Sequence, residues 1–162
     1  MKFIYFFIIT FIFLSGCDIL QTKSDNNYNL TASFNLSDTT GQESNTFNSG
    51  ESFNMSFRLI NSTPDTLTYT RGSPAPSVIF QILREDSVEA TSVDGYAFLQ
   101  VVLGGSLAPG DTLKGFWKAP NTPAQYPKVI LTSGNYQAKV TFPKFNNANI
   151  NQVSPINFSI IK

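Results

Sequence analysis

The sequence predicts an all-β protein, built around an antiparallel β-sandwich of seven to nine short strands. After residue 27, apolar residues recur at every second position in one stretch after another. This is the period of a strand that turns one face to a core and the other to water. Turn-forming residues separate the stretches, and none of them keeps the 3.6-residue period of a helix.

Six stretches show the alternation clearly. In chain order, their alternating positions are Tyr28, Leu30, Ala32, Phe34 and Leu36; Phe53, Met55, Phe57 and Leu59; Val78, Phe80 and Ile82; Leu113, Gly115 and Trp117; Tyr136, Ala138, Val140 and Phe142; and Ile156, Phe158 and Ile160. We expect Trp117 to be a core aromatic. Over the central part of the chain the expected strands are 51–61, 66–70, 78–84, 88–92, 97–103, 111–119 and 135–142.

The segments between these strands have turn chemistry of their own. In Leu107–Asp111, Pro109 presets the first φ of a type II turn, and Gly110 takes the positive φ that follows. We expect Glu85 and Asp86 at the tip of a hairpin. Adjacent strand residues would point to opposite faces, and a hairpin tip explains the pair without catalysis. The pair is therefore not expected to act as an acid and a base.

The first sixteen residues are typical of an export signal. Lys2 gives a positive start, and Phe3 to Leu14 form an apolar block that only Thr10 interrupts. A helix of this length would rise about 18 Å, which is less than the ~30 Å hydrocarbon core of a bilayer. The block is thus too short for a membrane-spanning helix.

The residues after this block resemble the bacterial lipobox. They read Leu14-Ser15-Gly16-Cys17, and Cys17 is the single cysteine of the chain. The resemblance implies cleavage before Cys17 and acylation of that residue. Several acyl chains anchor stably, because each buried methylene contributes ~0.8 kcal/mol. The alternative is an ordinary secretory signal that happens to end in cysteine.

The expected organisation is therefore a lipoprotein signal peptide (1–16), the lipidated Cys17 with a flexible tether (17–27) and a β-sandwich domain (28–162). The expected location is the cell envelope, with the protein lipid-anchored at the periplasmic face or the cell surface. Which of the two applies stays open at this point.

Composition excludes several classes of function. The chain has 11 basic and 11 acidic residues and no histidine, so no basic stripe predicts a nucleic-acid partner. Ser-His-Asp and Cys-His catalysis and His- or Cys-ligated zinc are excluded. No Asp-x-Asp-x-Asp run supports a calcium loop. We expect no enzymatic activity, no cofactor and no metal.

Three motifs occur in a suggestive order. Asn61 and Thr63 stand where an expected strand ends and precede a turn, Leu107–Asp111 forms the Pro-Gly turn, and Gly134 with Tyr136 opens a late strand. Between residues 50 and 142 this order resembles the BsuPI-type intracellular proteinase inhibitor family. The resemblance implies an immunoglobulin-like β-sandwich and proteinase inhibition. Its founding member is intracellular, whereas this chain is expected to be exported, and the family supplies no reactive-site motif to transfer.

The expected strand directions also predict where a binding surface lies. If the strands alternate up and down, the connections 71–76, 93–96 and 121–133 gather at one end, and the turns around Pro64, Asp86 and Pro109 gather at the other. The first end is rich in proline, tyrosine and basic residues, which favour interfaces. We predict a protein-binding surface there. Its residues are Arg71, Tyr96, Tyr126 and Lys128. The alternative is that these loops are merely long crossovers.

Four aspartates begin an Asp-Ser/Thr triplet that resembles a bacterial O-glycosylation acceptor. The acceptor hydroxyls would belong to Thr39, Thr66, Ser87 and Thr112. The alternative is turn formation, because aspartate followed by serine or threonine is common in turns.

The sequence leaves three functions open. The first is a lipid-anchored binding module without catalytic activity, whose partner is a protein such as a protease. The second is a proteinase inhibitor in the envelope, and the third is an accessory structural subunit of an envelope complex.

Overall fold

The computed structural model describes residues 30–146, 148 and 153–162 of the chain. This part contains ten strands and no helix, so the all-β prediction is confirmed and the predicted strand number was slightly low. The strands are β1 (Thr31–Ser37), β2 (Thr46–Asn48), β3 (Phe53–Ile60), β4 (Leu67–Arg71), β5 (Ile79–Arg84), β6 (Ser87–Thr91), β7 (Leu103–Leu107), β8 (Thr112–Ala119), β9 (Gly134–Thr141) and β10 (Ile156–Ile161).

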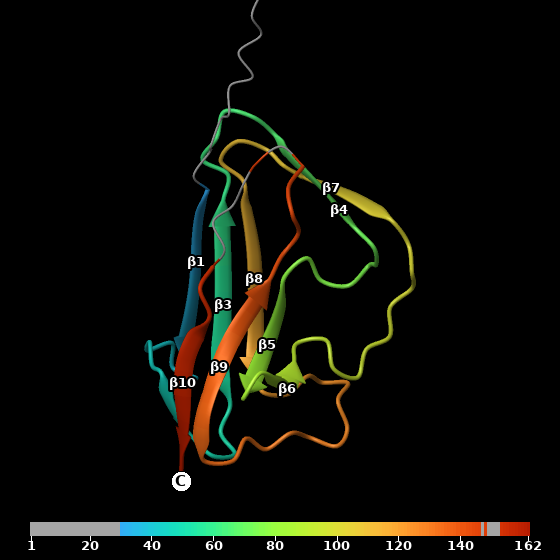
Figure 1. Ribbon diagram of the computed structural model, residues 1–162. Helices are drawn as coiled ribbons and strands as arrows, with labels where there is room; N and C mark the ends of the chain where they lie inside the picture. The colour runs from blue at the N-terminus through green and yellow to red at the C-terminus, as the bar shows by residue number, and fades with distance from the viewer. Residues whose placement is uncertain (1–29, 147, 149–152) are drawn as a thin grey trace, which may run out of the picture.

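The strands form two main sheets and a separate ribbon (Figure 1). Sheet A has the order β1-β3-β8 and is antiparallel throughout. Sheet B has the order β2-β10-β9-β5-β6, and its only parallel pair is β2 with β10. The ribbon pairs β4 with β7. Sheets A and B enclose the core, which gives a sandwich-like arrangement.

Aromatic side chains join the two sheets across the core. Phe53 of β3 stacks on Phe47 of β2, with ring centroids 4.3 Å apart, and lies 5.2 Å from Phe158 of β10. Phe158 in turn stacks on Tyr136 of β9 at 5.6 Å. Each such pair adds about 0.5–1.5 kcal/mol beyond its burial. Trp117 is only 5% exposed, so its predicted core position is confirmed.

Within the described part of the chain, the alternating apolar positions face the core. Phe53, Met55, Phe57 and Leu59 of β3 are all buried, whereas Ser56 and Arg58 between them are exposed. On β8 the core position between Leu113 and Trp117 is Gly115. A Cβ on Gly115 would lie 2.4 Å from Cγ1 of Val78, so the glycine leaves the space that this valine fills.

The predicted strand 97–103 was wrong. Residues 97–102 form no strand, and β7 begins at Leu103. The pairing with β4 sets these bounds: Leu107 lies opposite Leu67, and Gly105 lies opposite Tyr69. A Cβ on Gly105 would lie 2.4 Å from the Tyr69 ring, so the glycine gives that ring its place. The short strand β2 was missed because three residues with one buried side chain, Phe47, show no period.

The hairpin tip at Glu85 and Asp86 is confirmed, but its predicted end of the sandwich was wrong. Both residues have positive φ, 50° and 65°, in the turn between β5 and β6. Arg84 donates to Oγ1 of Thr132 at 3.0 Å, so the tip adjoins the segment 121–133 rather than the turns around Pro64 and Pro109. The alternation of strand directions fails because β4 and β5 both point down in Figure 1.

The turns around Pro64 and Pro109 do meet, as predicted, through the buried side chain of Asn61. Its Nδ2 donates to the carbonyl oxygens of Leu107 and Asp65, both at 2.8 Å. Its Oδ1 accepts from the backbone N–H of Thr63 at 3.1 Å and the hydroxyl of Thr63 at 2.7 Å. The backbone adds Gly110 N–H to the Asn61 carbonyl at 2.8 Å. One amide side chain therefore ties two turns together.

We predict that Asn61→Ala lowers the free energy of unfolding by about 3 kcal/mol or more, because it leaves buried backbone groups at Leu107 and Thr63 unpaired. Chemical denaturation measures the loss. Ser62→Ala is the matched control, since Ser62 is exposed, and should change stability by less than about 0.5 kcal/mol. Equal effects of the two substitutions would contradict the role of the Asn61 side chain.

Candidate functional site

Two long loops pack against each other beside sheet B. Loop 92–102 joins β6 to β7, and loop 120–133 joins β8 to β9. The hydroxyl of Thr122, which is buried, donates to the Asp94 carbonyl at 2.6 Å. Gly95 has a φ of +80°, and a Cβ there would lie 2.5 Å from the Ala124 carbonyl oxygen. The two loops thus meet backbone to backbone at a position that only glycine fits.

The side chain of Asp94 organises this junction. Its Oδ2 accepts the backbone N–H of Thr91 at 2.8 Å and the side-chain amide of Gln125 at 3.4 Å. Thr91 is the last residue of β6. The carboxylate therefore joins the end of sheet B to both loops and holds them in one arrangement.

Loop 120–133 is also braced from within. The side chain of Asn121 makes two hydrogen bonds with the backbone of Val129: Nδ2 donates to the carbonyl at 2.9 Å, and Oδ1 accepts the N–H at 2.7 Å. Trp117 donates from Nε1 to the Asn121 carbonyl at 3.2 Å. These bonds close the loop at its base and fix its conformation.

Exposed apolar side chains concentrate on these two loops. Of the nine large hydrophobic side chains that are exposed in the described part, six lie there: Tyr96, Leu99, Val101, Val102, Tyr126 and Ile130. Tyr126 is 94% exposed and Val102 is 82% exposed. Large exposed apolar groups gathered on ordered segments mark interaction surfaces more than scattered ones do.

The four residues predicted for binding have different surroundings. Tyr96 and Tyr126 are exposed on the joined loops. Lys128 is exposed, but its Nζ donates to the Thr122 carbonyl at 2.6 Å and so braces loop 120–133. Arg71 is half-buried and donates to the Ala75 carbonyl at 2.6 Å within its own segment. Segment 71–76 contacts the far part of loop 92–102, where the N–H of Val101 donates to the Gly72 carbonyl.

Sequence reasoning missed Leu99, Val101, Val102 and Ile130. Residues 97–103 were assigned to a strand whose apolar side chains would enter the core. The two successive valines at 101 and 102 break the alternation of a half-buried strand, and that irregularity was the available signal. Nothing in the residues around Ile130 distinguishes an exposed isoleucine from a core one.

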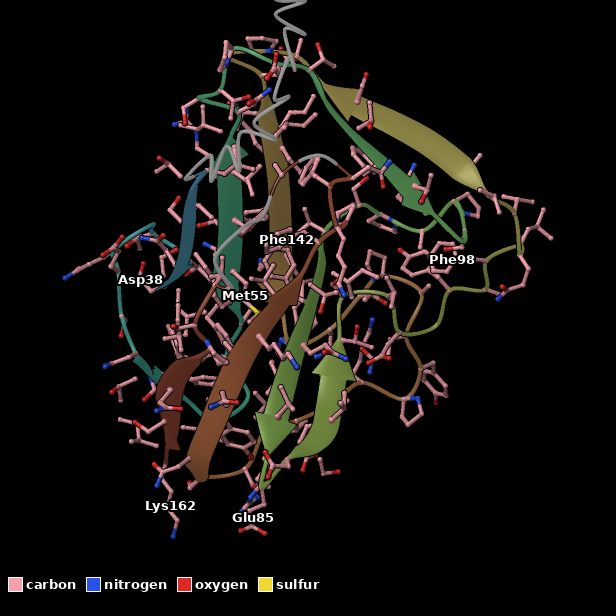
Figure 2. The ribbon with its side chains drawn as sticks, turned by 45° about the horizontal axis from the view of Figure 1, so that its top comes forward. Asp38, Met55, Glu85, Phe98, Phe142 and Lys162 are labelled. Carbon is pink, nitrogen blue, oxygen red and sulfur yellow. The ribbon has the colours of Figure 1, made fainter. Side chains whose placement is uncertain are left out.

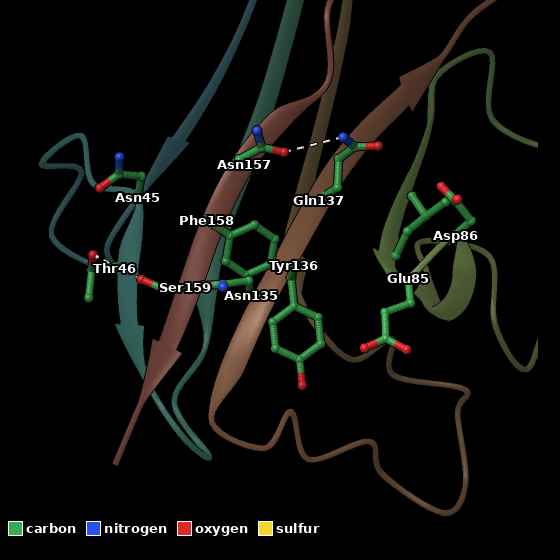
Figure 3. Close-up of a pocket in the computed structure, with 11 residues that line it drawn as sticks. Asn45, Thr46, Glu85, Asp86, Asn135, Tyr136, Gln137, Asn157, Phe158 and Ser159 are labelled. Atoms are coloured by element: carbon green, nitrogen blue, oxygen red, sulfur yellow. Dashed lines mark hydrogen bonds between the residues drawn. The ribbon is translucent and has the colours of Figure 1, made fainter.

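A second surface feature is a shallow hollow of about 650 Å³ on sheet B (Figure 3). Amide and hydroxyl side chains line it, and some of them bond to one another: Gln137 donates to Asn157 at 3.2 Å, and Thr46 and Ser159 are 3.3 Å apart. Glu85 and Asp86 lie at its rim. Within the described part of the chain, no three Asp, Glu, His or Cys side chains are grouped as metal ligands.

The Asp-Ser/Thr triplets lie in turns or at strand ends. Oδ1 of Asp38 accepts the hydroxyl and the N–H of Thr40 at 2.7 and 2.8 Å. The Thr40 hydroxyl, followed by the Gln42 N–H, lowers the pKa of Asp38 below its usual 3.8. Oδ2 of Asp111 accepts the N–H of Ala108 at 2.9 Å. At these two sites, turn formation accounts for the aspartate.

The predicted acceptor residues differ in exposure. Thr39, Thr66 and Ser87 are exposed, whereas Thr112 is half-buried. Their glycosylation stays a prediction. Cys17, the signal peptide 1–16 and the tether 17–27 lie outside the described residues.

The described residues include no helix long and apolar enough to cross a membrane. No family model matches the chain, and no curated protein matches it.

We predict that Gly95→Ala separates the two loops, because alanine resists a positive φ and its Cβ would strike the Ala124 carbonyl. The melting temperature should fall, and amide hydrogens around Thr122 should exchange faster. Gly104→Ala is the control, since a Cβ there meets no atom within 4 Å and its φ is ordinary. Unchanged exchange in Gly95→Ala would show that the contact does not hold the loops.

Proposed function

We propose that this protein is a lipid-anchored binding module of the cell envelope without catalytic activity. In this proposal, Cys17 carries the membrane anchor, and the joined loops 92–102 and 120–133 bind a protein partner. The observation that carries the proposal is the concentration of exposed apolar side chains on two loops that are braced against each other. The partner contacts we assign are Tyr96, Tyr126 and their apolar neighbours, with Lys128 at the edge and Arg71 as a support of the adjoining segment.

The physical basis of this proposal is the low entropic cost of binding through loops that are already ordered. A loop that is already fixed loses little conformational freedom on binding, and tyrosine supplies a large contact area with few rotatable bonds. Tyr126 stands almost fully in water on a segment whose base is closed by Asn121. Such an aromatic on a rigid support is suited to enter a partner's pocket.

A second candidate is proteinase inhibition on an immunoglobulin-like sandwich, as the resemblance to the BsuPI-type family implies. Two observations favour it. The motifs at Asn61 and at Leu107–Asp111 meet in space through hydrogen bonds. Residues 97–102 run without strand pairing and expose Leu99 and Val102, as a protease-binding segment must. A third candidate is an accessory subunit that holds one constant partner on the same loops.

We predict that the intact mass of the native protein equals residues 17–162 plus acyl groups on Cys17. Cys17→Ser should remain unprocessed or lose its acyl groups, because the thiol is the acylation site. A mass equal to the bare peptide would end the anchor proposal. Any further mass in hexose steps, lost when Thr39, Thr66 or Ser87 is replaced by alanine, would support the predicted glycosylation.

The partner surface can be tested by photocrosslinking in native cells. A photoreactive phenylalanine at Tyr126 or at Leu99 should yield one adduct of defined mass, whereas the same group at Val88, exposed on β6, should not. Replacing Tyr96, Tyr126 and Lys128 together by alanine should reduce the adduct formed from position 99 about tenfold. Equal adducts from all three positions would contradict a specific loop surface.

The same variants separate the candidates. The chain from residue 18 to 162 is mixed with a panel of serine proteases and metalloproteases, and its mass is checked afterwards. Stoichiometric inhibition by the uncut chain, lost in the triple variant, favours the inhibitor. Absence of inhibition, with the adduct intact, leaves the binding module.

A further inference from the structure

The outer face of sheet A carries nine side chains in a regular grid, and none of them belongs to the two loops. β1, β3 and β8 lie side by side (Figure 1), and their pairing aligns outward residues in three rows. The rows are Ser33, Arg58 and Lys114; Asn35, Ser56 and Phe116; and Ser37, Asn54 and Lys118. Directly opposed side chains of antiparallel strands lie about 4.5–5.5 Å apart at Cβ. The face is therefore one continuous surface.

Two like charges stand side by side in this grid. Arg58 of β3 is directly opposite Lys114 of β8, and both are exposed. Like charges at opposed positions of a sheet are destabilising. Among the described residues, neither side chain makes an ion pair or a hydrogen bond that would offset the repulsion. Lys118 adds a third positive charge on the same strand. An anionic group between Arg58 and Lys114 would remove the conflict.

An exposed aromatic ring lies among these cations. Phe116 is 68% exposed, and it stands between Lys114 and Lys118 on the outer face of β8. It stacks on no other ring of the described part. Phe116 lies on the edge strand of sheet A, and its flat apolar surface suits the C–H face of a ring-shaped ligand.

Other side chains along the same face offer hydrogen-bonding groups and a carboxylate. A groove of about 610 Å³ runs over the face, and Gly41 and Glu43 line it beside β1. The amide of Asn35 donates to Glu43 and so fixes that carboxylate at the β1 side of the groove. Hydroxyl, amide and carboxylate groups in one groove suit a ligand rich in hydroxyl groups.

We propose that the outer face of sheet A binds an acidic saccharide, as one residue or as part of a carboxylated glycan chain. The sugar ring stacks on Phe116, its carboxylate binds between Arg58 and Lys114, and its hydroxyl groups bond to Asn35, Ser56 and Glu43. An anionic lipid surface would meet the same cations. However, Glu43 would face the lipid phosphates, whereas it can accept hydrogen bonds from the hydroxyl groups of a sugar, so the chemistry of the groove favours the saccharide.

The test uses the chain from residue 18 to 162, which holds the whole core cluster from Leu30 to Ile160. Binding is measured by calorimetry with three acidic oligosaccharides, oligogalacturonate, oligoalginate and hyaluronan fragments, and with neutral oligodextran. At least one acidic probe should bind, with an affinity that falls as salt rises, and dextran should bind at least about tenfold more weakly. Amide shifts on addition should fall on β3 and β8.

Matched variants assign the contacts. Phe116→Ala and Lys114→Gln should each weaken binding about tenfold. Lys139→Gln on sheet B and Tyr126→Ala on loop 120–133 are the controls and should leave it unchanged. The second control also separates this surface from the proposed partner surface, so either can fail alone. Far-ultraviolet circular dichroism and the melting temperature show that each variant is folded.

Several results would each overturn the proposal. One is no binding by any acidic oligosaccharide. Another is equal binding of the acidic and neutral probes, or binding that Phe116→Ala does not change. The third is binding to vesicles of phosphatidylglycerol that Lys114→Gln abolishes while no acidic oligosaccharide binds, because that result assigns the face to a membrane.

Discussion

The buried amide of Asn61 is the interaction on which the rest of the structure depends. It lies directly after β3, the central strand of sheet A, and it bonds to the residues that lead into β8. Loop 62–66 and turn 107–111 therefore start from one fixed point. Loop 62–66 leads into β4, and turn 107–111 follows β7. Because Asn61 bonds to both segments, its amide also sets where the ribbon leaves the sandwich. Water cannot replace these bonds in a site that is wholly buried.

From this fixed frame the molecule presents two surfaces of opposite chemistry. The joined loops beside sheet B are apolar and aromatic, and they suit a protein surface. The outer face of sheet A is cationic and hydroxylated around Phe116, and it suits a charged, hydrated ligand. The core aromatics between the sheets, with Phe53 at their centre, link sheet A to sheet B. Met55 belongs to the same core (Figure 2). If the proposed anchor and both proposed surfaces are real, the protein engages a protein and a glycan at once.

The sequence was sufficient for the strands whose pattern is local. Alternation located β3, β8 and β9 almost to the residue, and the Pro109-Gly110 turn was as expected, with Gly110 at a φ of +83°. Prediction from the sequence failed where pairing between distant strands decides the bounds of a strand. Leu103 starts a strand only because β4 lies beside it, and residues 97–102 stay irregular because no strand does. For the same reason Tyr96 and Tyr126 could be proposed, but the exposed Leu99 could not. The grid on sheet A could not be predicted either, because it depends on the pairing register of β1, β3 and β8, which the pattern of a single strand does not reveal.

The two hydrogen bonds between the Asn121 side chain and the Val129 backbone have a consequence for how such a protein can evolve. These bonds close the segment below its tip. Within residues 123–127, Ala124 and Gln125 contact loop 92–102, whereas Tyr126 is 94% exposed. Substitutions of Tyr126 should therefore change the stability of the fold little. Selection on recognition can then act on this residue almost independently of selection on stability. A lineage could in this way acquire new specificities at the tip of the loop while its scaffold stays the same.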